Sequence, residues 1–265
     1  MSNFIQRPGM VGTNGRQLSL LWDDCPRAEI RSDPGAGYFF EDDFTVSPTL
    51  TGFYTATQAT QGTFLTLNKR NGVAEADCNS TTQHQGIQVQ RSTTVGAMFA
   101  PAANTKMWFE AEILMKDIAT MANIFIGLHD IDTTILSSGA LVDASNDWIG
   151  FKCETALSTL LGTCSNNTTE SVTSTLLTFS SLYDGDVTTD GSAWLKLGFK
   201  VWGTDKIEFY VNGTKSSSTI TSNIPTALMT PSLVCQTDGT TDPIMWIDRW
   251  ACYVEDRREA QSRTS

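Results

Sequence analysis

Apolar and polar side chains alternate along the last quarter of the chain, the period expected of β-strands with one buried face. In the run 194–202 the apolar positions that share a face are Leu195, Leu197, Phe199 and Val201. In the run 206–214, the positions Ile207, Phe209 and Val211 alternate with Glu208 and Tyr210. The second run ends in Asn212-Gly213, a dipeptide that tolerates positive φ and so predicts a tight hairpin turn.

A third run, 244–256, has the same alternation, with one face expected to carry Ile244, Trp246, Asp248, Trp250, Cys252 and Val254. Further strands are predicted at about 62–68, 86–92, 106–118, 122–130 and 147–155. The run 106–118 also admits a helix, but strict alternation over about ten residues favours a strand. The stretch 156–191 is rich in Ser and Thr, and predicts one or two short strands with long loops.

The two ends of the chain differ from this pattern. Residues 1–36 are rich in Pro and Gly, which predicts an extended N-terminal arm. Its apolar anchor is expected to be Leu18, Leu20, Leu21 and Trp22. The strand-rich part is expected to span 37–255 as one β-sandwich, and 256–265 to form a flexible polar tail.

Composition narrows the classes of partner. The chain has 265 residues, with 18 Lys and Arg against 29 Asp and Glu, so its net charge is −11. Such a surface repels phosphate backbones, and nucleic acid is not an expected partner. No run reaches the roughly 20 apolar residues of a transmembrane helix, and no secretory signal is recognised at the N-terminus. We therefore expect no membrane partner and synthesis in a reducing cytoplasm, where the six cysteines are buried thiols rather than disulfides.

The segments WLKLGFKVW, KIEFYVNGT and IMWIDRWACYVED together resemble the closing strands of the concanavalin A-like (laminin G-like) superfamily. The resemblance implies an all-β fold, a two-sheet antiparallel jelly-roll sandwich. Some glycanases of this superfamily have the motif E-x-D-x-x-E, whose carboxylates act on one sugar. The segment FEAEILMKD contains Glu110, Glu112 and Asp117 but lacks the central Asp, so the sequence predicts no catalytic site.

Other polar and aromatic residues allow two interpretations each. Trp108 and Trp202 lie on the polar side of their strands and are the candidates for a glycan-binding platform, although packing is the alternative. The sequence His129, Asp130, Asp132 offers nitrogen and oxygen ligands for a cation, or else a histidine at a strand end followed by a solvated loop. The second interpretation is preferred, so neither a metal site nor a cofactor is expected.

A second resemblance covers about 38–255. A Pro/Gly-rich arm, the acidic entry YFFEDDF, a Thr/Ser-rich sandwich and the closing W-I-D-R-W-x-C-Y-V look like virion proteins of tailed bacteriophages. This resemblance implies a non-enzymatic capsid decoration (cement) protein that is located on the virion after assembly in the host cytoplasm. Its implied partners are the major capsid protein or other virion subunits, and further copies of itself. The alternatives are a lectin-like module that binds glycans on a phage fibre and, less favoured, a glycan hydrolase.

Overall fold

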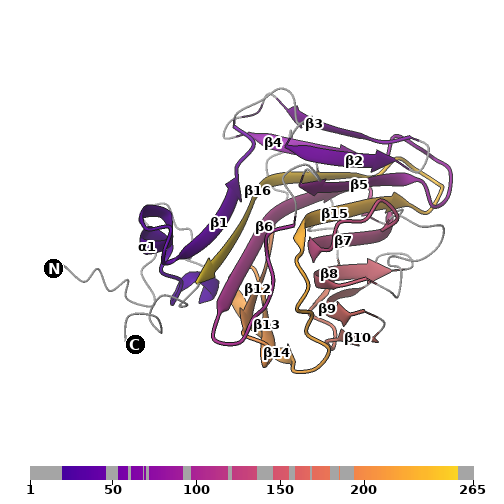
Figure 1. Ribbon diagram of the computed structural model, residues 1–265. Helices are drawn as coiled ribbons and strands as arrows, with labels where there is room; N and C mark the ends of the chain where they lie inside the picture. The colour runs from indigo at the N-terminus through magenta and orange to yellow at the C-terminus, as the bar shows by residue number, and fades with distance from the viewer. Residues whose placement is uncertain are drawn as a thin grey trace, which may run out of the picture.

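The structure is a computed structural model (Figure 1). It describes residues 20–45, 53–58, 61–67, 69, 72–91, 97–118, 121–135, 146–154, 159–167, 169–179, 185 and 194–255. Two short helical segments come first in this part of the chain, η1 (Leu20–Trp22) and α1 (Arg27–Ser32). The strands are β1 (Gly37–Asp42), β2 (Tyr54–Gln58), β3 (Thr63–Leu67), β4 (Val73–Asp77), β5 (Gly86–Arg91), β6 (Lys106–Lys116), β7 (Met121–His129), β8 (Trp148–Glu154), β9 (Thr159–Asn166), β10 (Thr169–Val172), β11 (Leu177–Thr178), β12 (Leu195–Trp202), β13 (Lys206–Val211), β14 (Thr214–Ile220), β15 (Thr230–Thr237) and β16 (Ile244–Glu255).

The strands form two antiparallel sheets. Sheet 1 has the order β14-β13-β12-β6-β16-β4-β3, and β1 also pairs with β16. Sheet 2 has the order β10-β9-β8-β7-β15-β5-β2, and β11 also pairs with β9. In Figure 1, the strands of sheet 2 follow one another from β5 down to β10, while the long strands β6 and β16 run towards α1. The prediction of an all-β, two-sheet antiparallel jelly-roll sandwich is confirmed.

The core lies between the sheets and is filled from the alternating positions that the sequence predicts. On β6 the inward side chains are Met107, Phe109, Ala111, Ile113 and Met115, and all are buried. Phe109 stacks on Phe199 of β12 with ring centroids 4.9 Å apart. Phe151 of sheet 2 meets Phe199 from the opposite side of the core at 6.3 Å. Burying each such ring stabilises the fold by roughly 1.5–3 kcal/mol.

The face predicted for the run 244–256 is wrong at its start, and a β-bulge in β16 is the reason. The register of β16 against β6 shifts between Ile247 and Arg249. Before the shift, Met245 and Ile247 point into the core, and after it Trp250, Cys252 and Val254 do so. Ile244 and Trp246 therefore lie on the outer face of sheet 1, opposite to Trp250. An extra residue in one strand reverses the side-chain alternation beyond it.

The predicted arm contains folded structure from Leu20 onward. Here η1 and α1 lie over sheet 1, and Leu21 and Ile30 are buried against it. Neither helical segment was predicted, because Pro and Gly recur through residues 1–36 and interrupt any helical pattern. Leu18 of the predicted anchor and the predicted tail 256–265 lie outside the described residues.

A central strand was also missed. β15 lies between β7 and β5 in sheet 2, and all of its residues are buried. Its outward positions include Val234 as well as Ser232 and Gln236, so polar and apolar residues do not separate cleanly by face. Alternation therefore gives a weak signal for this strand.

Candidate functional site

Trp108, predicted as a sugar platform, lies on the outer face of sheet 1 but is completely buried there. Its ring packs in a cluster with Leu21, Ile30, Tyr210 and Tyr253. The indole N–H donates to Asp24 Oδ1 at 3.2 Å. Burial by itself raises the pKa of Asp24, but the hydrogen bond and charge of the Lys200 ammonium outweigh it and hold that pKa below its ordinary value. Trp108 therefore anchors the N-terminal segment, and its ring has no free face for a sugar.

Trp202, the other predicted platform, is half-buried at the end of β12. Three ammonium groups lie over its ring, with Lys106 and Lys200 Nζ each 4.3 Å from the centroid and Lys206 Nζ at 4.8 Å. Its N–H donates to Glu208 Oε2 at 3.0 Å. Burial opposes ionisation of Glu208, but hydrogen bonds from Lys206, Lys215 and Trp202 lower its pKa to about 2. The ring is thus engaged in cation–π contacts, which a stacked sugar would have to displace.

Glu110 and Glu112, which resemble part of a glycanase motif, lie beside these residues on the outer face of sheet 1. Glu110 Oε1 accepts a hydrogen bond from the indole of Trp22 at 3.0 Å. Glu112 Oε2 lies 3.4 Å from Lys196 Nζ. Leu21 and Trp22 of the predicted anchor therefore meet Trp108 and Glu110 on one surface, where they hold the N-terminal segment in place. Leu20 of the same anchor is exposed.

The outer face of sheet 2 carries a different set of groups, which the sequence analysis did not single out. Lys152 Nζ lies 3.0 Å from Glu154 Oε2 and 2.6 Å from Glu170 Oε1. The lysine side chain is 7% exposed, whereas the glutamates are 32% and 34% exposed. We call these three residues the Lys152 cluster. It presents two solvent-accessible carboxylates that are held by one buried ammonium.

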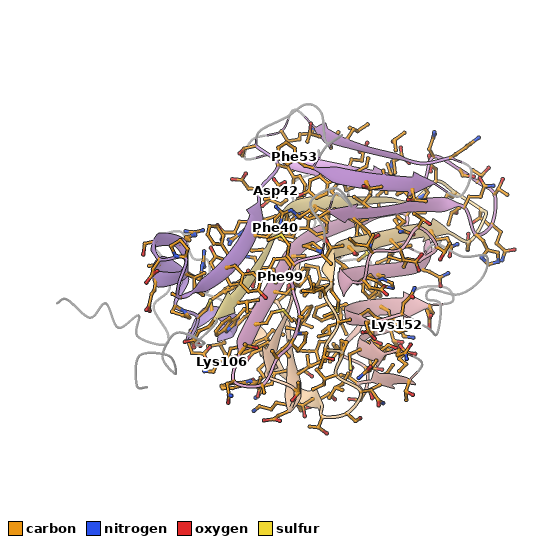
Figure 2. The ribbon with its side chains drawn as sticks, viewed as in Figure 1. Phe40, Asp42, Phe53, Phe99, Lys106 and Lys152 are labelled. Carbon is orange, nitrogen blue, oxygen red and sulfur yellow. The ribbon has the colours of Figure 1, made fainter. Side chains whose placement is uncertain are left out.

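The sheet geometry produces this cluster. Alternate residues of β8 point outward, which places Lys152 and Glu154 on one face. Glu170 comes from β10, two strands away, where it pairs with Ser165 of β9. Burial alone lowers the pKa of Lys152, but its hydrogen bonds with Glu170 and Glu154 raise it above the ordinary value. Figure 2 shows Lys152 on the strands of sheet 2, far across the view from Lys106 and the N-terminal segment.

Hydrogen bonds connect the cluster to the adjoining part of the sheet. The indole N–H of Trp148 donates to Thr163 Oγ1 at 3.2 Å. The Thr163 hydroxyl in turn donates to Glu170 Oε1 at 2.5 Å. Glu170 therefore receives hydrogen bonds from both Thr163 and Lys152, which fixes the position of its carboxylate.

A row of buried polar atoms runs across the sheet next to Trp148. Thr230, His129, Trp148 and Ser165 are cross-strand neighbours on β15, β7, β8 and β9. Among the residues that the structure describes, no hydrogen-bond partner is found for Thr230 Oγ1, His129 Nε2 or Ser165 Oγ. Buried polar atoms nearly always have a partner, so these three atoms are suited to hydrogen bonds with ordered water.

His129 is oriented by its neighbours. Its ring stacks on Trp148 with centroids 5.8 Å apart, and its Nδ1 lies 2.6 Å from Asp130 Oδ1 and 2.9 Å from the Asp130 carbonyl oxygen. Both neighbours of Nδ1 are oxygen atoms that can accept a hydrogen bond, which favours a proton on Nδ1.

The segment that follows β7 covers part of this face. Gln90 donates to the carbonyl oxygen of Asp130 at 2.8 Å and accepts from the N–H of Asp132 at 3.1 Å. Ile135 packs on the outer face with Phe125, Trp148 and Val234. Asp132, one of the three residues considered as cation ligands, uses its carboxylate to accept hydrogen bonds from Thr134 and Asn146. Among the described residues, no group of three or more His, Cys, Asp or Glu side chains is placed to hold a metal ion.

The sequence contained one signal for this site. In DWIGFKCET the outward positions are Trp148, Gly150, Lys152 and Glu154, an aromatic residue followed by opposite charges. Glu170 could not be assigned from sequence, because it lies in a Ser/Thr-rich stretch in which strand pairing is not specified by alternation.

No helix in the part of the chain that the structure describes is both long and apolar enough to cross a membrane.

Comparisons with solved structures identify proteins of the same fold. The β-glucanase of Bacillus licheniformis is 13% identical, with a TM-score of 0.51 over 83% of this chain and 98% of that enzyme. The endo-1,3-β-glucanase of Streptomyces sioyaensis is 13% identical, with a TM-score of 0.53 over 82% of this chain and 95% of that enzyme. No protein-family model matches the sequence, and no curated protein does either. The concanavalin A-like jelly-roll fold is thus supported.

These comparisons correct one expectation. The prediction that the protein is not an enzyme does not hold, because the structures that share its fold include β-glucanases. It rested on the incomplete motif at Glu110, Glu112 and Asp117 and on the resemblance to virion proteins, whereas the Lys152 cluster lies on the other sheet. The expected likeness to phage virion proteins has no support in these comparisons. Virion location, capsid partners and self-association stay predictions.

Proposed function

We propose that the protein binds a neutral glycan on the outer face of sheet 2, through the Lys152 cluster. The observation that carries this proposal is the pair of accessible carboxylates, Glu154 and Glu170, on one buried ammonium. Hydrogen bonds from sugar hydroxyls to an ionised carboxylate are stronger than those between neutral groups. Lys152 and Thr163 hold the acceptors in place before the ligand arrives, which lowers the entropic cost of binding.

Charge selects the class of glycan. The net charge of −11 and the two carboxylates of the cluster repel sulfated or uronic-acid polysaccharides. Neutral polysaccharides do not meet this repulsion, and the fold shared with β-glucanases supports β-glucans as the first ligands to test.

Glu154→Gln and Glu170→Gln are each expected to weaken glycan binding by about 10-fold to 100-fold, since a hydrogen bond to a charged group is worth about 1.5–3 kcal/mol. Binding is measured by isothermal titration calorimetry with the full chain, first with soluble β-1,3-glucan and then with a panel of neutral polysaccharides. Glu29→Gln, at an exposed position of α1, is the matched control and is expected to bind like the unmodified protein. The proposal is overturned if the unmodified protein binds no polysaccharide of the panel, or if both cluster variants bind as it does.

Hydrolysis of glycosidic bonds is the second candidate function. Because one ammonium contacts both carboxylates, the two are close enough to act on one sugar, as do the acid and the nucleophile of retaining glycosidases at roughly 5–5.5 Å from each other. Reducing-sugar release from β-1,3-glucan tests this candidate. We expect either Gln substitution to lower the rate at least 100-fold, as for a lost general acid or base. Equal rates in the variants and the unmodified protein would exclude the cluster from catalysis.

A further inference from the structure

Two cysteine thiols from different sheets meet inside the sandwich. Cys78 directly follows β4 of sheet 1, and Cys235 lies within β15 of sheet 2. Their Sγ atoms are 3.3 Å apart, and both side chains are completely buried. The residues are 157 positions apart in the chain, so their contact results from tertiary folding alone.

The geometry is close to that of a disulfide. A sulfur–sulfur bond is about 2.05 Å long, so the two atoms must approach by roughly 1 Å. Cys235 is fixed by pairing on both sides, with Ile87 of β5 and Ile124 of β7. Cys78 has more freedom because it lies beyond the end of β4, where its N–H donates to the carbonyl oxygen of Pro243 at 3.2 Å. A small shift of the stretch after β4 therefore closes the bond without breaking a strand.

The contact is specific to this pair among the cysteines whose hydrogen bonds are described. Cys164 Sγ, also buried, instead lies 3.2 Å from the carbonyl oxygen of Asn223. The thiol of Cys78 is shielded in the folded protein, since its contact with Cys235 and its burial raise its pKa well above the ordinary value. A neutral, buried thiol reacts slowly. Oxidation is therefore expected while the chain folds, before the two sheets enclose the pair.

We propose that Cys78 and Cys235 form a disulfide that joins the two sheets when the chain folds in the presence of a disulfide oxidant. The thiolate of one cysteine attacks the oxidant, a low-molecular-weight disulfide such as oxidised glutathione, and releases one thiol. The second cysteine, as its thiolate, then attacks the mixed disulfide and releases the other thiol. The two cysteines together lose two electrons, which reduce the oxidant's disulfide to two thiols. The two protons of the cysteine thiols end on these released thiols. This inference does not depend on the proposed glycan site.

The test is refolding of the full chain, either with a reduced/oxidised glutathione mixture or with excess reductant. The oxidised product is expected to have two fewer titratable thiols than the six cysteines of the reduced chain. Mass spectrometry of a non-reduced digest is expected to find the peptides of Cys78 and Cys235 linked. The melting temperature of the oxidised product is expected to rise by roughly 5–15 °C, because the bond restrains a long loop in the unfolded chain.

Variants separate the disulfide from packing effects. The double variant Cys78→Ala/Cys235→Ala is expected to melt at one temperature under both refolding conditions, whatever stability the substitutions themselves remove. Cys164→Ala, a matched buried thiol, is expected to keep the difference between oxidised and reduced protein. Six free thiols in the oxidised product, or a link between other cysteines in place of this pair, overturns the proposal.

Discussion

Trp108→Ala is expected to lower the free energy of unfolding by about 3–5 kcal/mol, the usual cost of truncating a large buried aromatic side chain. The ring is completely buried between sheet 1 and the N-terminal segment. Its loss also removes the indole N–H that donates a hydrogen bond to Asp24. The substitution therefore weakens both the packing and the attachment of residues 20–32.

Chemical unfolding monitored by circular dichroism gives the free energy, and limited trypsin digestion reports the segment itself. Cleavage after Arg27 and Arg31 is expected to become faster in the variant, since α1 is no longer held against Trp108 and Tyr253. Trp202→Ala is the matched control, because this tryptophan is half-buried at a strand end. Its expected cost is about 1 kcal/mol. If the two substitutions cost the same, Trp108 does not anchor the segment.

Lys152→Met is expected to remove about 2 kcal/mol of stability at neutral pH and to abolish glycan binding. The lysine is nearly buried, and without it the two carboxylates of Glu154 and Glu170 face each other with no counter-charge. Partial exposure of both glutamates screens this repulsion, so the cost is below the 3–5 kcal/mol of a fully buried pair. The unmodified protein keeps this contribution at pH 7, because the pKa of Lys152 is raised and its stabilisation is lost only as the pH rises through that value.

The pH dependence of the variant distinguishes charge from packing. As the pH rises through the raised pKa of Lys152, the unmodified protein loses the ammonium charge, so its difference in stability from the variant is expected to shrink. The double variant Lys152→Met/Glu170→Gln is expected to recover part of the lost stability at neutral pH. Lys196→Met, which breaks the more exposed ion pair with Glu112, is the control, with an expected cost below about 1 kcal/mol. A cost for Lys152→Met that does not vary with pH would contradict the electrostatic explanation.

For the site, local sequence identified one half of the cluster and missed the other. Lys152 and Glu154 are on a strand that was predicted correctly, and their outward direction follows from its period. Glu170 is contributed by a short strand in a stretch without clear alternation, and it reaches Lys152 only through the pairing of β9 with β8 and β10. Trp108 and Trp202 were placed on the correct face. The residues that cover Trp108, among them Leu21 and Ile30, and one of the lysines over Trp202, Lys106, are distant in the chain.

Side-chain alternation alone established the β-class of this protein and the inward faces of β6, β12 and β13, because burial of one sheet face imposes a period of two on any strand that borders a core. Other features needed long-range packing. These features are the bulge in β16, the central place of β15, the docking of η1 and α1, the Cys78–Cys235 contact and the meeting of Lys152 with Glu170. Each brings together segments that are distant in the chain, and the local sequence of a segment does not specify its partner. Tertiary structure therefore moved the candidate site from the tryptophans of sheet 1 to the charged outer face of sheet 2.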